Sequence, residues 1–530
     1  MVENKGNSTV LGSIRWSIIG QALSRVMMIG VSIVLARLLA PEDFGLMAMA
    51  MVIIGFMETF YELGTGSAII QKKEISQELL SSLFYINIFF GIFLAILFGS
   101  SGHFVAELYQ DDRVAPILQV MGLVFFISSF GLVHHALMRR NLNFDRLTII
   151  ETITLVIDSV VAIVLAVMGW SVWALVYSLL ANRLALTVLL FVSEKWRPGF
   201  QFSITEVKTV LSFTLNLTGS KIFNYFSRNS DKFIIGRFLG AASLGYYSLA
   251  FKLITYPIEF VQTALGRVLF PALARLEDNK SFRIMYLRAC GAIALLVFPI
   301  MVGMGTLADP FINVVYDSKW EPSVIILIIM SPVGIVQSIL STVIHIYLVK
   351  GRTDQYFAWA FTSGAVIAVS FVCGLPWGLL GVTIAFSSAI MLLGALGFWM
   401  PFRLIELKMR DFLKVLSPYF LMSVAMAAAI FVCNYWLKSI GASQFWQLLA
   451  GTATGFLSYS ILCLLAKPAA LADLIRLMPT VVQKNPLFKS ITDANIRSDV
   501  AVSANGKKNG DNLISIDETH PKKEFQNGVR

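Results

Sequence analysis

The fold is decided by residues 33–54, which read IVLARLLAPEDFGLMAMAMVII, and by residues 233–254, which read FIIGRFLGAASLGYYSLAFKLI. The two stretches align at a spacing of 200 residues without a gap, and a turn glycine of one, Gly45, corresponds to Gly245 of the other. Each stretch reads as the end of one apolar helix, a short turn and the start of the next. The chain therefore contains an internal repeat, which predicts two similar halves.

The composition around this repeat is that of a membrane protein. Of the 530 residues, 57% are hydrophobic and 14% are charged, whereas about a quarter of a soluble chain is charged. Apolar blocks of the roughly 20 residues that cross a bilayer recur along nearly the whole chain. They are too long for the strands of a membrane barrel, so helices must satisfy the backbone within the lipid. We predict an all-α polytopic membrane protein with about fourteen transmembrane helices.

The repeat organises these helices into bundles. The predicted spans are residues 12–36, 44–63, 79–100, 114–137, 149–168, 171–192, 209–230, 243–262, 287–307, 324–347, 356–374, 377–399, 416–436 and 445–465. Six spans separate the two copies of the repeat, and an even number preserves orientation. We therefore expect two pseudo-symmetric six-helix bundles, residues 1–200 and 201–402. Residues 403–466 add two transmembrane helices, and residues 467–530 form a cytoplasmic, largely disordered tail.

Charge sets the expected orientation. With the amino terminus in the cytoplasm, the inside connections hold most of the Lys and Arg residues, as the positive-inside rule requires. An even number of spans then places both termini in the cytoplasm. The net charge of +10 reflects this bias and contact with anionic lipids, not nucleic-acid binding.

The sequence offers nothing that points to an enzyme. It contains no Walker loop and no HExxH or GxSxG motif, and its four cysteines lie in apolar blocks without metal-site spacing. We expect no catalytic residues, no metal and no cofactor.

Cations occur within the first helix of each predicted bundle. Arg25 lies in the span 12–36, and Lys221 and Arg228 lie in the span 209–230. A charge at the centre of a bilayer costs at least about 2.5–3.5 kcal/mol, so such groups normally face protein or a watery cavity. Two repeat-related helices that face one cavity would bring these cations together as an anion site, where the planar fork of arginine suits phosphate oxygens.

The alternative is that acidic residues of neighbouring spans neutralise these cations in structural ion pairs. The acidic candidates are Glu58 and Glu62 for Arg25, and Asp231 and Glu259 for the two cations of the seventh span. Candidates for binding a coupling proton or cation are Glu58, Glu62 and Asp158, and the membrane potential is the alternative driving force. Arg183 is interpreted as a side chain that snorkels towards the interface, and Trp320 as an interfacial anchor.

Several stretches together carry a resemblance to a known family. They are IVLARLLAPEDFGLMAMAMVIIGF, GTGSAIIQKKEIS, LMRRNLNFDRLTIIET and RVLFPALARLEDN. They closely resemble the polysaccharide transporter branch of the MOP flippase superfamily, and most of all the Wzx-type exporters of colanic acid and other exopolysaccharides. The resemblance covers most of the chain before the polar tail. It implies the MOP flippase fold, with two six-helix bundles in a V shape.

The same resemblance implies a function. A protein of this kind would translocate undecaprenyl-pyrophosphate-linked oligosaccharide repeat units across the bacterial inner membrane by alternating access, for exopolysaccharide, capsule or lipopolysaccharide synthesis. Arg25, Arg228 and Lys221 would hold the pyrophosphate. The sugars would occupy a polar cavity lined by Gln21, Asn216, Ser220 and Asn224. Membrane lipids, and the polymerase and export machinery of the same glycan pathway, are further candidate partners.

Two rival functions remain open at this point. A MATE-like drug/cation antiporter of the same superfamily would need acidic cavity groups, whereas the predicted site here is basic. A membrane-embedded glycan polymerase or ligase usually has a large periplasmic loop, and no loop of that size is predicted.

Overall fold

The computed structural model describes residues 24–61, 66, 69–70, 72 and 74–477. These residues form helices joined by short connections, and they contain no β-strand. The prediction of an all-α protein is therefore confirmed.

The first described helix covers residues 24–38. It is followed by α2 (Pro41–Tyr61), α4 (Gln77–Tyr109), α5 (Val114–Met121), α6 (Leu123–Ser129), α7 (Leu132–Arg140), α8 (Phe144–Val167), α9 (Val172–Ser193), α10 (Ile204–Ala274), α11 (Asn279–Thr306), α12 (Ala308–Val315), α13 (Pro322–Leu340), α14 (Val343–Val349), α15 (Thr353–Gly374), α16 (Gly378–Leu404), α17 (Met409–Ser439), α18 (Gln444–Ala466) and α19 (Ala469–Leu477). Two short 3-10 turns are η1 (Ser318–Trp320) and η2 (Leu375–Trp377).

Many of these helices are built to cross a membrane. In the described part of the chain, eight are long and apolar enough to do so, and the bent pair Val114–Ser129 and Leu132–Arg140 would make a ninth. The predicted spans from residue 79 onward all fall on helices. The protein is therefore a multi-pass membrane protein, while the count of fourteen spans stays a prediction.

Several helix ends lie beyond the predicted boundaries, and at two of them a backbone feature marks the end. Helix α4 continues past residue 100 to Tyr109, where Gln110 takes a left-handed conformation (φ 57°) and caps the last turn. Helix α10 does not stop at residue 230 but continues to Gly240, whose φ of 82° breaks it into two parts. Glycine adopts this conformation without the steric penalty that a Cβ atom brings.

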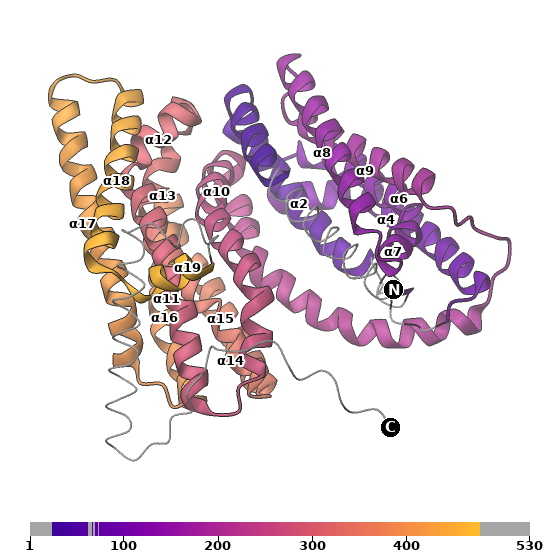
Figure 1. Cartoon of the computed structure of the whole chain (residues 1–530). Helices are drawn as coiled ribbons and strands as arrows, with labels where there is room; N and C mark the ends of the chain where they lie inside the picture. Colours follow the sequence, from indigo (N-terminus) through magenta and orange to yellow (C-terminus); the bar gives the residue numbers. More distant parts are fainter. Residues whose placement is uncertain (1–23, 62–65, 67–68, 71, 73, 478–530) are drawn as a thin grey trace, which may run out of the picture.

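The helices gather into two groups, which Figure 1 shows side by side. Helix 24–38 packs on α8 and α9 through Leu35, Leu39 and Ala162, and together with α2–α9 it forms what we call the N-terminal group. Helices α11–α18 form the C-terminal group, with α17 and α18 at its outer edge. Helix α10 begins beside the first group and ends within the second, so it joins them.

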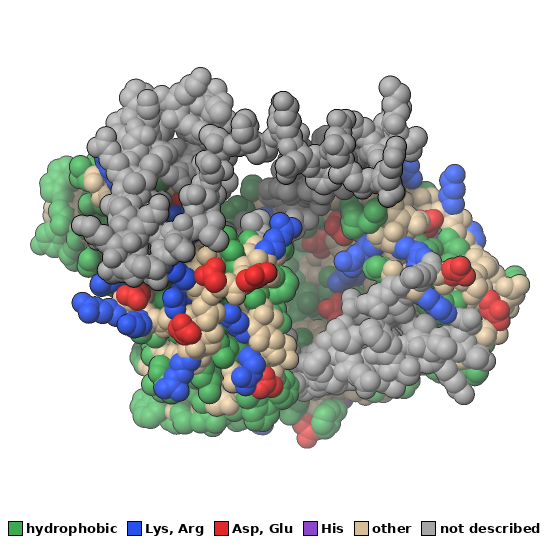
Figure 2. Space-filling view, turned by 60° about the horizontal axis from the view of Figure 1, so that its bottom comes forward, with side chains coloured by type: hydrophobic (Ala, Val, Ile, Leu, Met, Phe, Trp, Pro, Cys, Tyr) green, Lys and Arg blue, Asp and Glu red, His purple; other side chains and the backbone are tan. Residues whose placement is uncertain are grey.

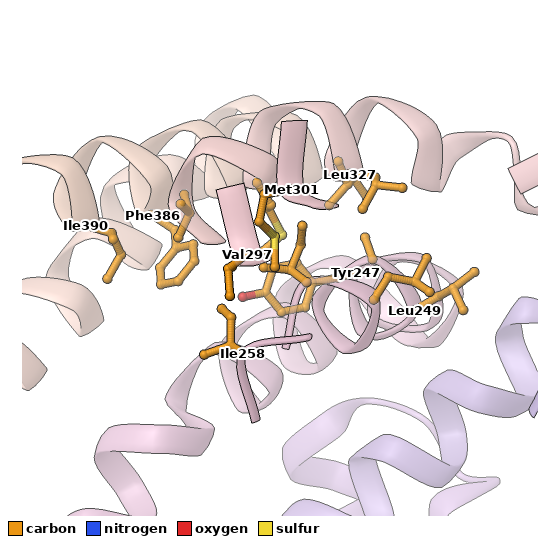
Figure 3. Packing of buried hydrophobic residues seen from close by; sticks show 14 of the residues in the cluster. Tyr247, Leu249, Ile258, Val297, Met301, Leu327, Phe386 and Ile390 are labelled. Carbon is orange, nitrogen blue, oxygen red and sulfur yellow. The ribbon is translucent and has the colours of Figure 1, made fainter. Parts of the chain in front are cut away.

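The core of the C-terminal group is apolar. Figure 3 shows side chains of α10, α11, α13 and α16 meeting there, among them Tyr247, Met301 and Leu327, which are fully buried. Large apolar side chains on the outside of the molecule, such as Phe89 on α4 and Phe456 on α18, are instead exposed. Lipid chains suit such surfaces, because the hydrocarbon around a membrane protein is as apolar as its side chains.

Candidate functional site

The two groups touch at one end through a pair of glycines. A Cβ atom at Gly45 of α2 would overlap the carbonyl oxygen of Ala241, and one at Gly245 of α10 would overlap the carbonyl oxygen of Pro41. The two contacts are reciprocal, because Pro41 and Ala241 are also 200 residues apart. We call these two contacts the glycine contact. They let the backbones of α2 and α10 approach more closely than side chains allow.

A second set of bonds crosses between the groups at the same end. Arg37 donates from Nε to the carbonyl oxygen of Val315 at 2.9 Å, and from Nη2 to that of Val314. These are the last two carbonyls of α12, where the helix dipole favours a positive charge. In return, Trp320 donates from its indole nitrogen to the carbonyl oxygen of Ala36 at 2.8 Å. We call these bonds the Arg37–Trp320 contact.

Trp320 corrects one interpretation of the sequence. It was expected to be an interfacial anchor, but it is fully buried, and its ring packs edge-on against Phe44 at 5.3 Å. A signal for its position exists in the sequence. The stretches FVAELYQDDR, which ends at Arg113, and FINVVYDSKW, which ends at Trp320, share Phe and Tyr in register.

Arg113 stays within its own group. It pairs with Glu42 at 2.8 Å and with Asp111 at 2.8 Å. Its hydrogen bond to Asp111 holds the pKa of that carboxyl below its usual range. Arg113 therefore makes contacts within the N-terminal group, whereas Trp320 connects one group to the other.

Further along the same helices, an ion pair joins the groups. Arg25 Nη1 lies 3.2 Å from Glu259 Oε2 of α10, and both side chains are about half exposed, at 54% and 45%. At about 1.5 Å per residue, Arg25 lies about 18 Å along its helix from Arg37. Arg25 therefore has an acidic partner, as the structural alternative expected, although Glu259 was considered for the seventh span. Glu58, one of the acids considered for Arg25, pairs with Arg183 at 3.3 Å.

The space near these charges is open. Figure 2 shows the molecule hollowed between the two groups, with both acidic and basic side chains on the walls of the hollow. Tyr225 of α10 packs against α2, and its hydroxyl donates to the carbonyl oxygen of Val52 at 2.7 Å. Asp231, a neutralising candidate for the seventh span, is buried, and one of its oxygens accepts a hydrogen bond from the Tyr247 hydroxyl at 3.2 Å.

Two of the candidate coupling acids lie around one arginine. Arg183 of α9 contacts Glu58 of α2, and it also interacts electrostatically with Asp158 of α8. The Ser178 hydroxyl lies near Asp158 and donates to the carbonyl oxygen of Leu175 at 3.1 Å. The interpretation of Arg183 as a snorkelling side chain missed this role, since hydropathy reports depth and not neighbours.

The remaining predicted site residues lie outside the described part of the chain. Gln21 and Glu62 are outside it altogether. The backbone of α10 is described, but the side chains of five predicted site residues on it are not: Asn216, Ser220, Lys221, Asn224 and Arg228.

Fold and sequence comparisons define the class of protein. The structure matches the Lipid II flippase MurJ in an inward closed conformation with a TM-score of 0.68 at 17% sequence identity, over 84% of this chain and 97% of that one. The MOP flippase fold implied by the resemblance is thereby confirmed. The chain is thus a multi-helix membrane protein with the fold of this class of transporter. It belongs to the polysaccharide biosynthesis protein family, whose sequence model matches residues 34–325.

Two relatives have names that fit this family. The chain is 28% identical to the lipopolysaccharide biosynthesis protein WzxC of Escherichia coli, over 71% of this chain and 77% of WzxC. It is 27% identical to the succinoglycan biosynthesis transport protein ExoT of Rhizobium meliloti, over 88% of this chain and 95% of ExoT. The resemblance to Wzx-type proteins is confirmed by these matches.

Proposed function

We propose that the protein is a flippase, not an enzyme, that moves undecaprenyl-pyrophosphate-linked oligosaccharide repeat units across the bacterial inner membrane. The observation that carries this proposal is the position of Arg25. Its guanidinium reaches across to Glu259 of α10. A guanidinium that lies where the two groups face each other suits an anionic lipid headgroup, because its charge-assisted hydrogen bonds to phosphate oxygens are strong. The names of WzxC, ExoT and MurJ support the same substrate class.

The proposed site has three parts. Arg25, Arg228 and Lys221 hold the pyrophosphate, while the sugars lie along Gln21, Asn216, Ser220 and Asn224. The polyprenyl chain stays in the lipid. Residues 1–200 and 201–402 act as two bundles that rock about this site, residues 403–466 add two helices, and the termini face the cytoplasm. In this orientation the glycine contact lies on the periplasmic side, and the state that we propose for these contacts is open to the cytoplasm.

Transport is driven by a proton or cation gradient that acts on acidic side chains. Glu58, Glu62 and Asp158 bind the coupling proton or cation. Two carboxylates beside one guanidinium carry a net negative charge, which is costly within a membrane and is neutralised when one proton or monovalent cation binds.

The proposal is tested in liposomes that contain the purified protein and a lipid-linked oligosaccharide. The measurement is the fraction of sugar exposed on the far leaflet, read with an impermeant sugar-oxidising reagent. We expect wild-type protein to expose the sugar and the double variant Arg25→Ala, Arg228→Ala to expose none. Arg403→Ala is the matched control, because Arg403 lies 3.8 Å over the ring of Trp399 on its own helix. Wild-type rates in the double variant would reject the anion site, and no flipping by the wild type would reject the function.

A further inference from the structure

A separate cavity lies within the N-terminal group, between α2, α6, α7 and α9. Its volume is about 300 Å³, at the lower end of the range for small-molecule sites. Its polar walls come from Glu58, Ser128, His135, Arg183 and Thr187, and the rest of its lining is apolar. Arg25, the residue with a described side chain among those assigned above to the pyrophosphate and the sugars, is not part of this described lining.

One hydrogen-bond donor of Arg183 in this cavity is unpaired among the described residues. Arg183 Nη2 donates to Glu58 Oε1 at 3.3 Å, which is longer than the roughly 2.7–2.9 Å of a strong charge-assisted bond. Arg183 Nε is buried, and among the described residues it has no hydrogen-bond partner. A buried donor left unpaired is unfavourable, so an acceptor from a ligand would stabilise this arrangement.

The lining selects the chemistry of that ligand. Arg183 donates and Glu58 accepts, while Thr187, whose hydroxyl donates to the carbonyl oxygen of Ile127 at 3.1 Å, has oxygen lone pairs left to accept. A phosphate or carboxylate would meet the like charge of Glu58, and a bare metal ion would fill little of the volume. A neutral sugar ring presents hydroxyls that both donate and accept, together with apolar C–H faces, and it matches both kinds of wall.

The cavity also lies beside the path proposed for the headgroup. Glu58 follows, by about one helical turn, the part of α2 that packs on α10. There the Phe56 and Tyr225 rings lie 6.0 Å apart, and Tyr225 donates to Val52. Glu58 therefore lines the cavity and also lies next to the contact between α2 and α10.

We propose that this cavity is a subsite for one neutral sugar ring of the lipid-linked oligosaccharide. The inference rests on the proposed function and adds a selectivity element to it. The cavity holds a ring beyond the first sugar, and the protein thereby discriminates a completed oligosaccharide from a lipid that carries a single sugar.

The test fills the cavity without adding charge. Gly131 lines it in ordinary helical conformation, and a Cβ atom there would meet only atoms at 3.4 Å or more, including the Thr187 hydroxyl. Gly131→Leu therefore projects into the cavity. Gly99→Leu on α4 is the matched control, because a Cβ atom at Gly99 has no neighbour within 4 Å.

Two probes are compared by equilibrium binding to the protein in nanodiscs. They are undecaprenyl pyrophosphate bearing one hexose and the same lipid bearing a neutral tetrasaccharide. We expect wild type and Gly99→Leu to bind the tetrasaccharide lipid about tenfold more tightly, which one or two net hydrogen bonds supply. In Gly131→Leu and Arg183→Gln the two lipids should bind equally. Glu58→Gln should keep most of the preference, because an amide still forms hydrogen bonds to hydroxyls.

The outcomes separate the subsite from the function. If wild type binds both lipids equally, or if Gly131→Leu keeps the full preference, the subsite is rejected and the proposed function stands. If wild type binds neither lipid and flips neither in liposomes, the proposed function is rejected and the subsite with it.

Discussion

Arg25 Nη1 lies 3.2 Å from Glu259 Oε2, so a side chain of the first described helix is paired with one 234 residues later in the sequence. Both side chains are about half exposed, and exposed ion pairs contribute only about 0–1 kcal/mol to stability. The pair is therefore poorly suited to holding the protein together. It places a carboxylate on the cation that the proposed function assigns to the pyrophosphate, so Glu259 and the substrate would compete for Arg25.

Because Glu259 and the substrate compete for Arg25, neutralising Arg25 and neutralising Glu259 should change substrate affinity in opposite directions. Arg25→Gln should weaken binding of undecaprenyl pyrophosphate by about 10- to 100-fold, the usual effect of losing a hydrogen bond to a charged group. Glu259→Gln should instead tighten binding, because it removes the competing carboxylate. The measurement is the Kd of each variant in nanodiscs. Equal weakening by both substitutions would mean that the pair is structural and that Arg25 is not part of the anion site.

The glycine contact should tolerate no side chain. Gly45→Ala and Gly245→Ala each push a Cβ atom into a backbone carbonyl of the other group, and overpacking of this kind costs typically about 1–3 kcal/mol. The state open to the cytoplasm should therefore lose population, relative to the alternative state, by about 5- to 150-fold. A cysteine at Ser248, which is buried on α10, reports this change through its labelling by an impermeant maleimide from the periplasm.

Labelling should rise strongly in both glycine variants while protein levels stay normal. Gly30→Ala serves as control, since a Cβ atom at Gly30 has no neighbour within 4 Å. Unchanged labelling and unchanged export in Gly45→Ala would show that the contact can relax without opening the protein.

Weakening the Arg37–Trp320 contact should raise labelling at the same cysteine, Ser248→Cys, by a smaller factor. Trp320→Phe keeps the packing on Phe44 but removes the hydrogen bond to the Ala36 carbonyl, which is worth about 0.5–1.5 kcal/mol. Periplasmic labelling at Ser248→Cys should rise by about 2- to 12-fold. Arg37→Ala should act in the same direction, because it removes both bonds to the end of α12.

The repeat supplies the control for this experiment. Arg237 corresponds to Arg37 in the alignment of the halves, yet its guanidinium lies over Phe238, its own neighbour, at 5.4 Å. Arg237→Ala should leave labelling unchanged. If Arg237→Ala and Arg37→Ala raise labelling equally, the bonds to Val314 and Val315 have no special role.

Features that depend on local sequence pattern, such as the helices and the repeat, could be predicted from the sequence. Apolar blocks predicted the helices, and the repeat put Gly45 and Gly245 in register before their reciprocal contacts were known. Sequence reasoning could not pair Arg25 with Glu259, because that pairing depends on how two distant helices cross. It missed Arg183 for a related reason, since hydropathy indicates how deep a charge lies but not that two carboxylates flank it. Trp320 was misplaced because an aromatic residue near a predicted span end is common both at interfaces and in cores.

Arg183 leads to the last prediction, which concerns the driving force. With Glu58 and Asp158 both ionised, the cluster that they form with Arg183 carries one net negative charge. Asp158→Asn removes that excess, so no proton or cation is needed for neutrality. Flipping down the gradient of the lipid itself should continue, but stimulation by an imposed proton or sodium gradient should be lost. The measurement is the rate of sugar exposure in liposomes with and without each gradient.

The control for this experiment is an acid on the same helix. Glu151 of α8 is more than half exposed and lies 4.0 Å from His135, so Glu151→Gln removes a carboxylate without touching the Arg183 cluster. It should leave the gradient stimulation intact. Because the cluster can take up charge only if it starts with an excess, a variant Asp158→Asn that still responds to a gradient would place the coupling site elsewhere in the protein.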